Sequence, residues 1–197
     1  VGAGAQARTQ LVAILTVYGK LAEVKVWSRT KETRETFIRE MKQACARNID
    51  NMEAVEEVED AIKGSELLVT TTSSKAPLVM DDWISSGMHI NCIGADAPGR
   101  QELDPAILKR AKIVVDDKEQ ASYSGEINVP LSQGKLKSKD IWGELGEIIA
   151  GLKKGRINDD EITVFVSTGL AIQDAVTANM AYKNAMARGV GQTVEIM

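Results

Sequence analysis

The sequence has few of the residue types that mark metal sites, disulfide scaffolds or base-stacking surfaces. Its 197 residues include one histidine, two cysteines and 4% aromatic side chains. Cys45 and Cys92 belong to neither a CxxC pair nor a Cys/His cluster, so we expect free thiols and no metal site. The formal net charge is −4 and basic residues are not concentrated, which argues against nucleic acid as a partner.

Long apolar runs are also missing. No stretch of about eighteen apolar residues, the length that crosses a bilayer, occurs in the chain. No basic segment leads into a short apolar stretch, as it would in a signal peptide. We therefore expect no membrane partner and a cytoplasmic location. With 44% hydrophobic and 26% charged residues, the composition is that of a globular protein able to bury a core.

Short β-rich segments alternate with helical patterns along the chain. Strands are expected at residues 23–27, 67–72, 89–94, 112–116, 162–166 and 194–197. Helices are expected at residues 9–20, 32–46, 53–63, 81–86, 104–109, 144–154 and 171–187. This alternation favours right-handed crossovers and a parallel sheet covered on both faces. The expected fold class is therefore α/β, with a doubly wound parallel sheet.

A glycine pattern opens the chain. Gly2, Gly4 and Ala7 have the Gly-x-Gly-x-x-Ala spacing, in which the first glycine makes a tight turn and the second lets backbone approach a pyrophosphate. The helix expected next would offer its N-terminal N–H groups to the phosphates. By itself the pattern is weak, and a packing turn without a ligand fits it equally well.

A second segment bears on the cofactor. Ser28, Arg29 and Thr30 follow a predicted strand, at the point where a NAD-specific site places an acidic residue on the ribose 2′-hydroxyl. A guanidinium and two hydroxyls suit a 2′-phosphate instead, which favours NADP(H), although NAD(H) would also fit. The alternative is a helix N-cap at Ser28 or Thr30, and the two roles are compatible.

Five longer segments carry a resemblance to a known family. In order they are GSELLVTTTSSKAPLV, GMHINCIGADAPGRQELDPAILKRAKIVVDD, GEI, GELGEIIAGLKKGR and TVFVSTGLAIQDAVTA. Together they resemble the ornithine cyclodeaminase/mu-crystallin family over nearly the whole chain, and within it most closely the archaeal-type alanine dehydrogenases. The resemblance implies a Rossmann-like NAD(P)-binding domain, a homodimer, and chemistry on the α-carbon of an amino acid.

The resemblance also implies a set of site residues. It assigns Ala5 and Gln6, beside the two glycines, to the pyrophosphate, and residues 28–30 to the adenosine ribose. The loop that closes over nicotinamide and substrate contains Ser167 and Thr168. The remaining cofactor contacts that it implies are Thr72, Ser73, Ile93, Gly94, Ala95 and Arg100.

Asp96, in the segment GADAPG, matches the acid/base carboxylate proposed for the family. It follows the carboxyl end of a predicted strand, where open α/β sheets bind ligands. A carboxylate there can activate the water that attacks an imine after hydride has left the α-carbon. From the residues alone, an Asx turn before Pro98 and Gly99 fits better, and the resemblance favours catalysis. His89, the one histidine, is expected to be a hydrogen-bonded core residue instead.

The activity that the resemblance implies is NAD(P)-dependent oxidation of a small amino acid to an oxo acid and ammonia, or the reverse. We rank alanine dehydrogenase first, ornithine cyclodeaminase second and cyclic ketimine reductase third. A non-catalytic, NADPH-binding crystallin-like protein is the alternative from another class, and the carboxylate at Asp96 favours the enzyme.

In this family a first strand and a substrate and dimerisation domain precede the glycine turn. The chain starts at Val1, so we expect both to be missing from it. Residues 1–170 would then form a dinucleotide-binding domain without its first strand. Residues 171–197 would form a helix and a strand that return to the absent domain.

Overall fold

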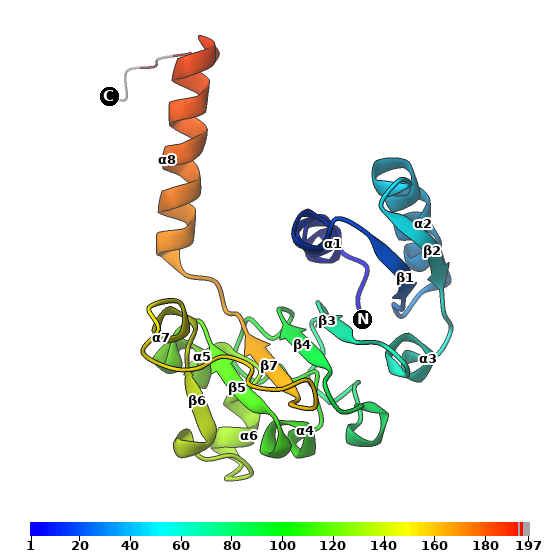
Figure 1. Cartoon of the computed structure of the whole chain (residues 1–197), viewed down its shortest axis with the longest axis vertical. Coiled ribbons are helices and arrows are strands. Elements are labelled where there is room, and N and C mark those ends of the chain that lie inside the picture. The colour runs from blue at the N-terminus through cyan, green and yellow to red at the C-terminus, as the bar shows by residue number, and fades with distance from the viewer. Residues whose placement is uncertain (193, 195–197) are drawn as a thin grey trace.

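The computed structural model describes residues 1–192 and 194, and every strand pair in this part of the chain is parallel. Five strands form one sheet in the order β3-β4-β7-β5-β6, and β1 pairs with β2 in a second, smaller sheet. Helices separate most of the strands along the chain (Figure 1). The predicted α/β fold class is confirmed, although the strands divide between two sheets.

The first ten elements from the N-terminus extend as far as β5. They are α1 (Ala5–Tyr18), β1 (Leu21–Val26), α2 (Lys31–Cys45), β2 (Ile49–Ala54), α3 (Val58–Ile62), β3 (Leu67–Thr70), the 3-10 helix η1 (Asp81–Trp83), β4 (His89–Cys92), α4 (Pro105–Arg110) and β5 (Lys112–Val115). Then come α5 (Lys118–Ser124), α6 (Asn128–Ser132), the 3-10 helix η2 (Ser138–Asp140), β6 (Ile141–Glu144), α7 (Leu145–Ile149), β7 (Thr163–Val166) and α8 (Ala171–Arg188).

Several sequence-based expectations are wrong in detail. The helix expected over 53–63 is limited to α3, because residues 49–54 form the unpredicted strand β2. The helix expected over 144–154 is limited to α7, and Gly151 follows it with a positive φ of 73°. The helix expected from residue 9 begins four residues earlier, and β6, α5 and α6 have no counterpart in the prediction. The strand expected over 194–197 lies outside the described residues, apart from Val194.

Two apolar clusters form the core. The larger packs one face of the five-stranded sheet, including Ile90, Ile113 and Val164, against α4, α5 and the loops around them. The smaller joins α1, α2, β1 and β2, with Leu15, Phe37 and Met41 among its members. The sheet residues alternate between buried and less buried positions in β3 and β4, as expected for strands that pack one face on a core.

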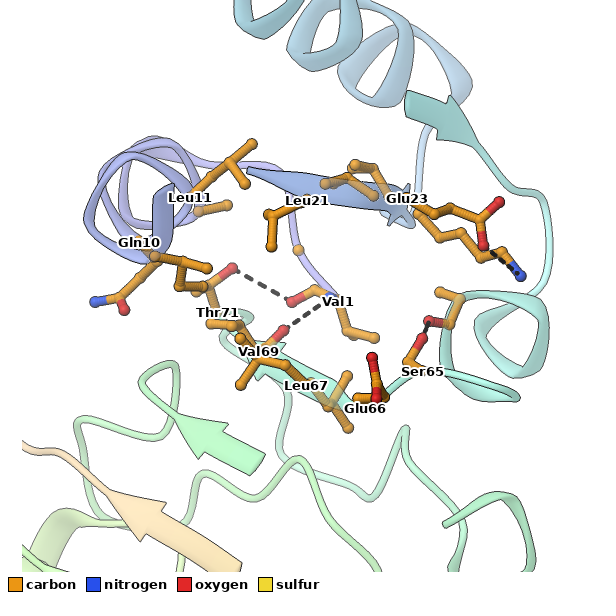
Figure 2. Close-up of a pocket in the computed structure, with 18 of the residues that line it drawn as sticks. Val1, Gln10, Leu11, Leu21, Glu23, Ser65, Glu66, Leu67, Val69 and Thr71 are labelled. Atoms are coloured by element: carbon orange, nitrogen blue, oxygen red, sulfur yellow. Dashed lines mark hydrogen bonds and ion pairs between the residues drawn. The ribbon is translucent and has the colours of Figure 1, made fainter. Parts of the chain in front are cut away.

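Val1 and Gly2 connect the two sheets, and Figure 2 shows Val1 beside Val69 and Thr71. The Val1 nitrogen donates to the Val69 carbonyl at 2.8 Å, and the Val1 carbonyl accepts from the Thr71 N–H at 2.9 Å. On the other side, the Gly2 N–H donates to the Trp27 carbonyl at 2.8 Å, just after β1. Among the described residues no strand precedes α1, and the backbone hydrogen bonds of Val1 and Gly2 join the ends of β1 and β3. A cavity of about 390 Å³ lies between the facing strand edges.

Helix α8 extends away from both sheets (Figure 1). None of its residues is buried, and its exposed apolar side chains include Ile172, Val176 and Met180 at helical spacing. The division of the chain at residue 170 into a cofactor domain and a returning tail remains a prediction.

The glycine turn makes a prediction about stability. Gly2→Ala should lower the free energy of unfolding by at least about 2 kcal/mol, because the new side chain would be strained at a positive φ. The Gly2 φ is 102°, and a Cβ there would lie 2.3 Å from the Thr71 Oγ1. The control is Gly4→Ala, since Gly4 has φ −82° and open space around it. This N-cap change should cost about 1 kcal/mol or less. Urea unfolding measures both, and equal losses would contradict the prediction.

Candidate functional site

The predicted site residues gather at one edge of the molecule. Residues 28–30 follow β1, residues 72–73 follow β3, residues 93–96 follow β4 and residues 167–168 follow β7. Because β3, β4 and β7 pair in parallel within one sheet, their carboxyl ends lie on the same side. Val1 and Gly2 bond to both Trp27 and Thr71, which brings the ends of β1 and β3 to either side of the glycine turn.

The glycine turn leads directly into α1. Gly4 is the N-cap of the helix, and Ala5 and Gln6 are exposed in its first turn. No atom lies within 4 Å of the position that a Gly4 Cβ would take, so the backbone is open to a ligand there. Arg8 holds the turn in shape by donating to the carbonyls of Ala3 at 2.7 Å and Gly4 at 2.9 Å. The sequence analysis did not identify Arg8.

The turn after β1 is held by its own polar groups and by α2. Thr30 caps α2 by accepting from the Thr33 N–H at 3.4 Å, which confirms the N-cap alternative. Ser28 is buried and donates through Oγ to the Thr30 carbonyl at 3.2 Å, whereas Arg29 is exposed. The buried Arg34 donates to the Ser28 carbonyl at 2.7 Å and was not identified from the sequence. Within residues 1–192, neither guanidinium forms an ion pair.

The ends of β3 and β4 meet at a buried carboxylate that the sequence analysis also missed. Glu102 accepts from the Thr72 N–H at 2.6 Å and from the Gly94 N–H at 3.1 Å. Among the neighbouring predicted residues, Ser73 is exposed, Ile93 is half-buried and Ala95 is buried. The Thr72 and Gly94 backbones are therefore held by Glu102, and the Thr72 hydroxyl also accepts from the Ser74 N–H at 3.2 Å.

Asp96 is exposed and forms an ion pair with Arg100, four residues further along the chain. The tight turn between them closes through the backbone, with the Arg100 N–H donating to the Ala97 carbonyl at 3.2 Å. Asn128 supports the same loop, since its side chain accepts from the Gly99 N–H and donates to the Arg100 carbonyl, each at 2.9 Å. The arrangement joins one carboxylate and one cation, which is not the Asx turn expected from the residues alone.

The loop after β7 is organised by Asp116, at the end of β5. Its carboxylate accepts from the N–H groups of Thr168 at 2.6 Å and Gly169 at 2.9 Å, and from the Thr168 hydroxyl at 3.0 Å. Ser167 approaches the same carboxylate at 3.4 Å. Both predicted residues of this loop are thus held in place, and the Thr168 hydroxyl oxygen keeps its lone pairs free to accept a hydrogen bond. Asp116 was not identified from the sequence.

The histidine and the cysteines lie away from this edge or are inaccessible. His89 begins β4, at the opposite end of the strand, and bonds to Thr163 at 2.7 Å and Asn91 at 3.1 Å. Burial lowers its pKa, in agreement with the predicted core role. Cys45 and Cys92 are free and buried, and burial raises the pKa of the Cys92 thiol well above its usual range.

Two other kinds of feature are absent from the described part of the chain. Residues 1–192 and 194 contain no group of three or more His, Cys, Asp or Glu side chains arranged to bind a metal ion. No helix in the same range has both the length and the apolar character needed to span a bilayer.

Comparison with known proteins identifies relatives. A profile of the ornithine cyclodeaminase/mu-crystallin family matches residues 1–189. Alanine dehydrogenase of Archaeoglobus fulgidus is 46% identical over 195 residues, which cover 99% of this chain and 58% of that protein. The chain thus spans less than two thirds of the length of this relative.

Solved structures show the same likeness. An archaeal alanine dehydrogenase dimer with bound NAD superposes with a TM-score of 0.92 and 45% identity, over 100% of this chain and 59% of that one. The Δ1-pyrroline-2-carboxylate reductase of Thermococcus litoralis, in complex with NADH and L-proline, gives a TM-score of 0.92 and 39% identity. This superposition covers 98% of the present chain and 59% of the reductase chain. The chain belongs to the ornithine cyclodeaminase/mu-crystallin family.

Proposed function

We propose that the whole protein is an NAD(P)-dependent oxidoreductase that acts on the α-carbon amine of a small amino acid, as an alanine dehydrogenase does. The observation that carries this proposal is the edge formed by the parallel strand ends. There an open glycine turn, a capped α2 and the Asp96–Arg100 pair lie on adjoining strand ends, in a chain 46% identical to an alanine dehydrogenase. Open α/β sheets bind ligands outside the carboxyl ends of their strands.

The described residues fit a dinucleotide. No atom lies within 4 Å of the position that a Gly4 Cβ would take. The free N–H groups at the start of α1 would present the positive end of the helix dipole to a bound anion. The turn at residues 28–30 leads into α2, and the guanidinium of the buried Arg34 lies against this turn, because it donates to the Ser28 carbonyl. We propose that the first helix holds the pyrophosphate and the second holds the adenosine ribose.

The chemistry divides between the cofactor and the chain. A bound nicotinamide supplies or accepts the hydride. Arg100 orients the Asp96 carboxylate, since the two side chains already form an ion pair. We propose that Asp96 accepts a proton from the water that adds to the imine carbon and passes it to the nitrogen of the resulting carbinolamine, so that ammonia leaves and the oxo acid remains. In the reverse direction the same carboxylate returns that proton to the departing water.

A second activity is supported by a specific likeness. The Thermococcus litoralis reductase with NADH and L-proline is 39% identical and superposes as well as the alanine dehydrogenase does. Reduction of a cyclic imine needs the same hydride donor but no addition of water. An unmodified protein that reduces the cyclic imine but does not oxidise amino acids would therefore be a reductase.

We further propose that the whole protein is a homodimer. The archaeal alanine dehydrogenase structure at 45% identity is a dimer. Helix α8 carries exposed apolar side chains, and an exposed apolar face of this kind is typical of an interaction surface.

The first prediction from this proposal concerns the substrate. Pyruvate with ammonia should be reduced with a kcat/KM at least about tenfold above that for Δ1-pyrroline-2-carboxylate, a difference of about 1.4 kcal/mol in transition-state stabilisation. Initial rates of NAD(P)H oxidation measure both reactions. A higher kcat/KM for the cyclic imine would instead indicate that the protein is a reductase.

The second prediction concerns the cofactor. We propose that NADP(H) is preferred, because Arg29 and the hydroxyls of Ser28 and Thr30 can bond a 2′-phosphate. NADPH should bind at least about tenfold more tightly than NADH, as one charge-assisted bond allows. Arg29→Gln should remove most of the difference, whereas Arg39→Gln on the exposed part of α2 should not. Fluorescence titration gives each Kd, and equal or tighter NADH binding would contradict the preference.

The third prediction concerns Asp96. Asp96→Asn should lower kcat for amino-acid oxidation by about 100-fold or more, because the amide cannot accept the proton from water. Cofactor affinity should stay within about threefold, a change of less than 1 kcal/mol. Asp82→Asn, an exposed change in η1, is the control and should alter neither quantity. Near-normal turnover of the Asp96 variant would leave this residue with only a structural role in its turn.

A further inference from the structure

Glu102 and Glu126 form a buried pair of carboxylates beneath the predicted cofactor edge. Both residues are 0% exposed. Both oxygens of Glu126 accept from the Glu102 N–H, at 2.9 and 3.0 Å, and Glu126 Oε1 also accepts from the Leu103 N–H at 2.7 Å. Burial raises the pKa of both carboxyls, and mutual repulsion adds to the rise for Glu126. Burying two carboxyl groups next to each other is energetically costly, and the hydrogen bonds that they accept offset part of this cost.

The Glu102 carboxylate lies just beyond the last paired residues of β3 and β4. The register of β3 with β4 closes at Thr70 opposite Cys92. Beyond this pair the Ile93 and Gly94 N–H groups both donate to the Thr70 carbonyl, at 2.9 and 3.1 Å. Glu102 adds a second link, accepting from the Thr72 N–H at 2.6 Å on one oxygen and the Gly94 N–H at 3.1 Å on the other. One side chain therefore continues the connection between the two strand ends past the Thr70 carbonyl.

Gly94 is adapted to this bridge. A Cβ at Gly94 would lie 2.6 Å from the Glu102 Oε2 and 2.2 Å from the Thr72 carbonyl oxygen. Its φ is not among the positive values, so the requirement for glycine comes from close approach and not from backbone conformation. The absence of a side chain at Gly94 is thus explained by Glu102 and the Thr72 backbone.

Hydrogen bonds and short chain segments connect the Glu102 bridge with the proposed catalytic pair, Asp96 and Arg100. Gly94 precedes Asp96 by two residues, and its carbonyl accepts from the Asp96 N–H at 3.1 Å. Arg100 also approaches that carbonyl, at 3.5 Å, and it precedes Glu102 by two residues. A shift of the Glu102 carboxylate would move both members of the pair, although Glu102 itself is buried and cannot reach a substrate.

We propose that Glu102 is a positioning residue that sets the spacing between the ends of β3 and β4, and thereby aligns the nicotinamide half of the cofactor with Asp96. This inference rests on the proposed oxidoreductase function for its effect on turnover. Its effect on cofactor binding and on the two backbone amides depends only on the bridge. Glu126 supports the backbone of the same loop, and its hydrogen bonds within the described part of the chain go to the Glu102 and Leu103 N–H groups, not to the strand ends.

The test compares Glu102→Gln with Glu126→Gln in the whole protein. An amide at position 102 has one acceptor oxygen for two N–H donors, so either the Thr72 or the Gly94 N–H must lose its Glu102 acceptor and face a second donor. The Gly94 N–H would keep the Thr70 carbonyl, at 3.1 Å, as its other acceptor. An amide at position 126 can place its oxygen where Oε1 stands and still accept from both N–H groups, with its NH2 at the Oε2 position, 3.0 Å from the Glu102 N–H. The two variants make the same chemical change in the same buried pair, and only Glu102→Gln changes the bridge between the strand ends.

Three measurements are made on each variant. Glu102→Gln should weaken NADPH binding about tenfold and speed hydrogen exchange about tenfold at whichever of the Thr72 and Gly94 amides loses the carboxylate oxygen, as expected when a buried donor loses an acceptor. With an α-deuterated amino acid, the kinetic isotope effect on kcat of Glu102→Gln should rise, because poorer alignment of the nicotinamide with the substrate makes hydride transfer rate-limiting. Glu126→Gln should remain within about threefold of the unmodified protein in both binding and exchange.

Each outcome decides the matter. If the two variants change cofactor affinity and amide exchange equally, Glu102 is not a positioning residue. If Glu102→Gln does not fold, Glu102→Asp provides the same comparison, because it keeps both oxygens but is too short to reach both strand ends. If the unmodified protein turns over no amino acid or imine, the proposed function fails, while binding and exchange still test the bridge.

Discussion

Parallel strands leave the same problem at each of their carboxyl ends: the ladder stops, and the next N–H groups need acceptors. Burying an unpaired backbone donor is costly, so a structure must supply an oxygen at each of these points. In this protein buried or half-buried carboxylates do so. Glu102 serves the ends of β3 and β4, and Asp116 serves the loop after β7. The conformation of the whole ligand-facing edge depends on these bonds.

The same constraint explains how charge is distributed at this edge. The carboxylates that hold the loops are turned inward and are occupied by backbone donors. Two cationic groups lie at the turn after β1: Arg29 is exposed, and the buried Arg34 guanidinium donates to the Ser28 carbonyl. The start of α1 adds free N–H groups beside an open glycine. An anionic cofactor can therefore approach without facing the charge of these inward carboxylates, and the exposed Asp96 has its own cation in Arg100.

The parts of the fold that could be predicted from sequence are those whose burial is continuous. Strands β4, β5 and β7 lie inside the five-stranded sheet, and β3 lies beside β4 with Val1 bonded to its other edge. Their apolar runs identified all four within two residues at either end. The edge strands β2 and β6 were missed, because polar residues or glycine interrupt them. In β2, only Ile49 and Met52 are buried, which does not give a strict alternation. The short helices α5 and α6 offer too few turns for periodicity to be recognised.

The sequence by itself determined the fold class, the family and the segments from which the candidate site is built, because these depend on local pattern and on motifs read in order. Only the tertiary structure decided which polar side chains are buried and what they hold. Glu102 meets Thr72 from 30 positions away, and Glu126 meets Glu102 from 24 positions away. In the sequence these glutamates resemble many solvated acidic residues. Their environment is created by segments that come together only when the sheet forms, and no local pattern records that contact.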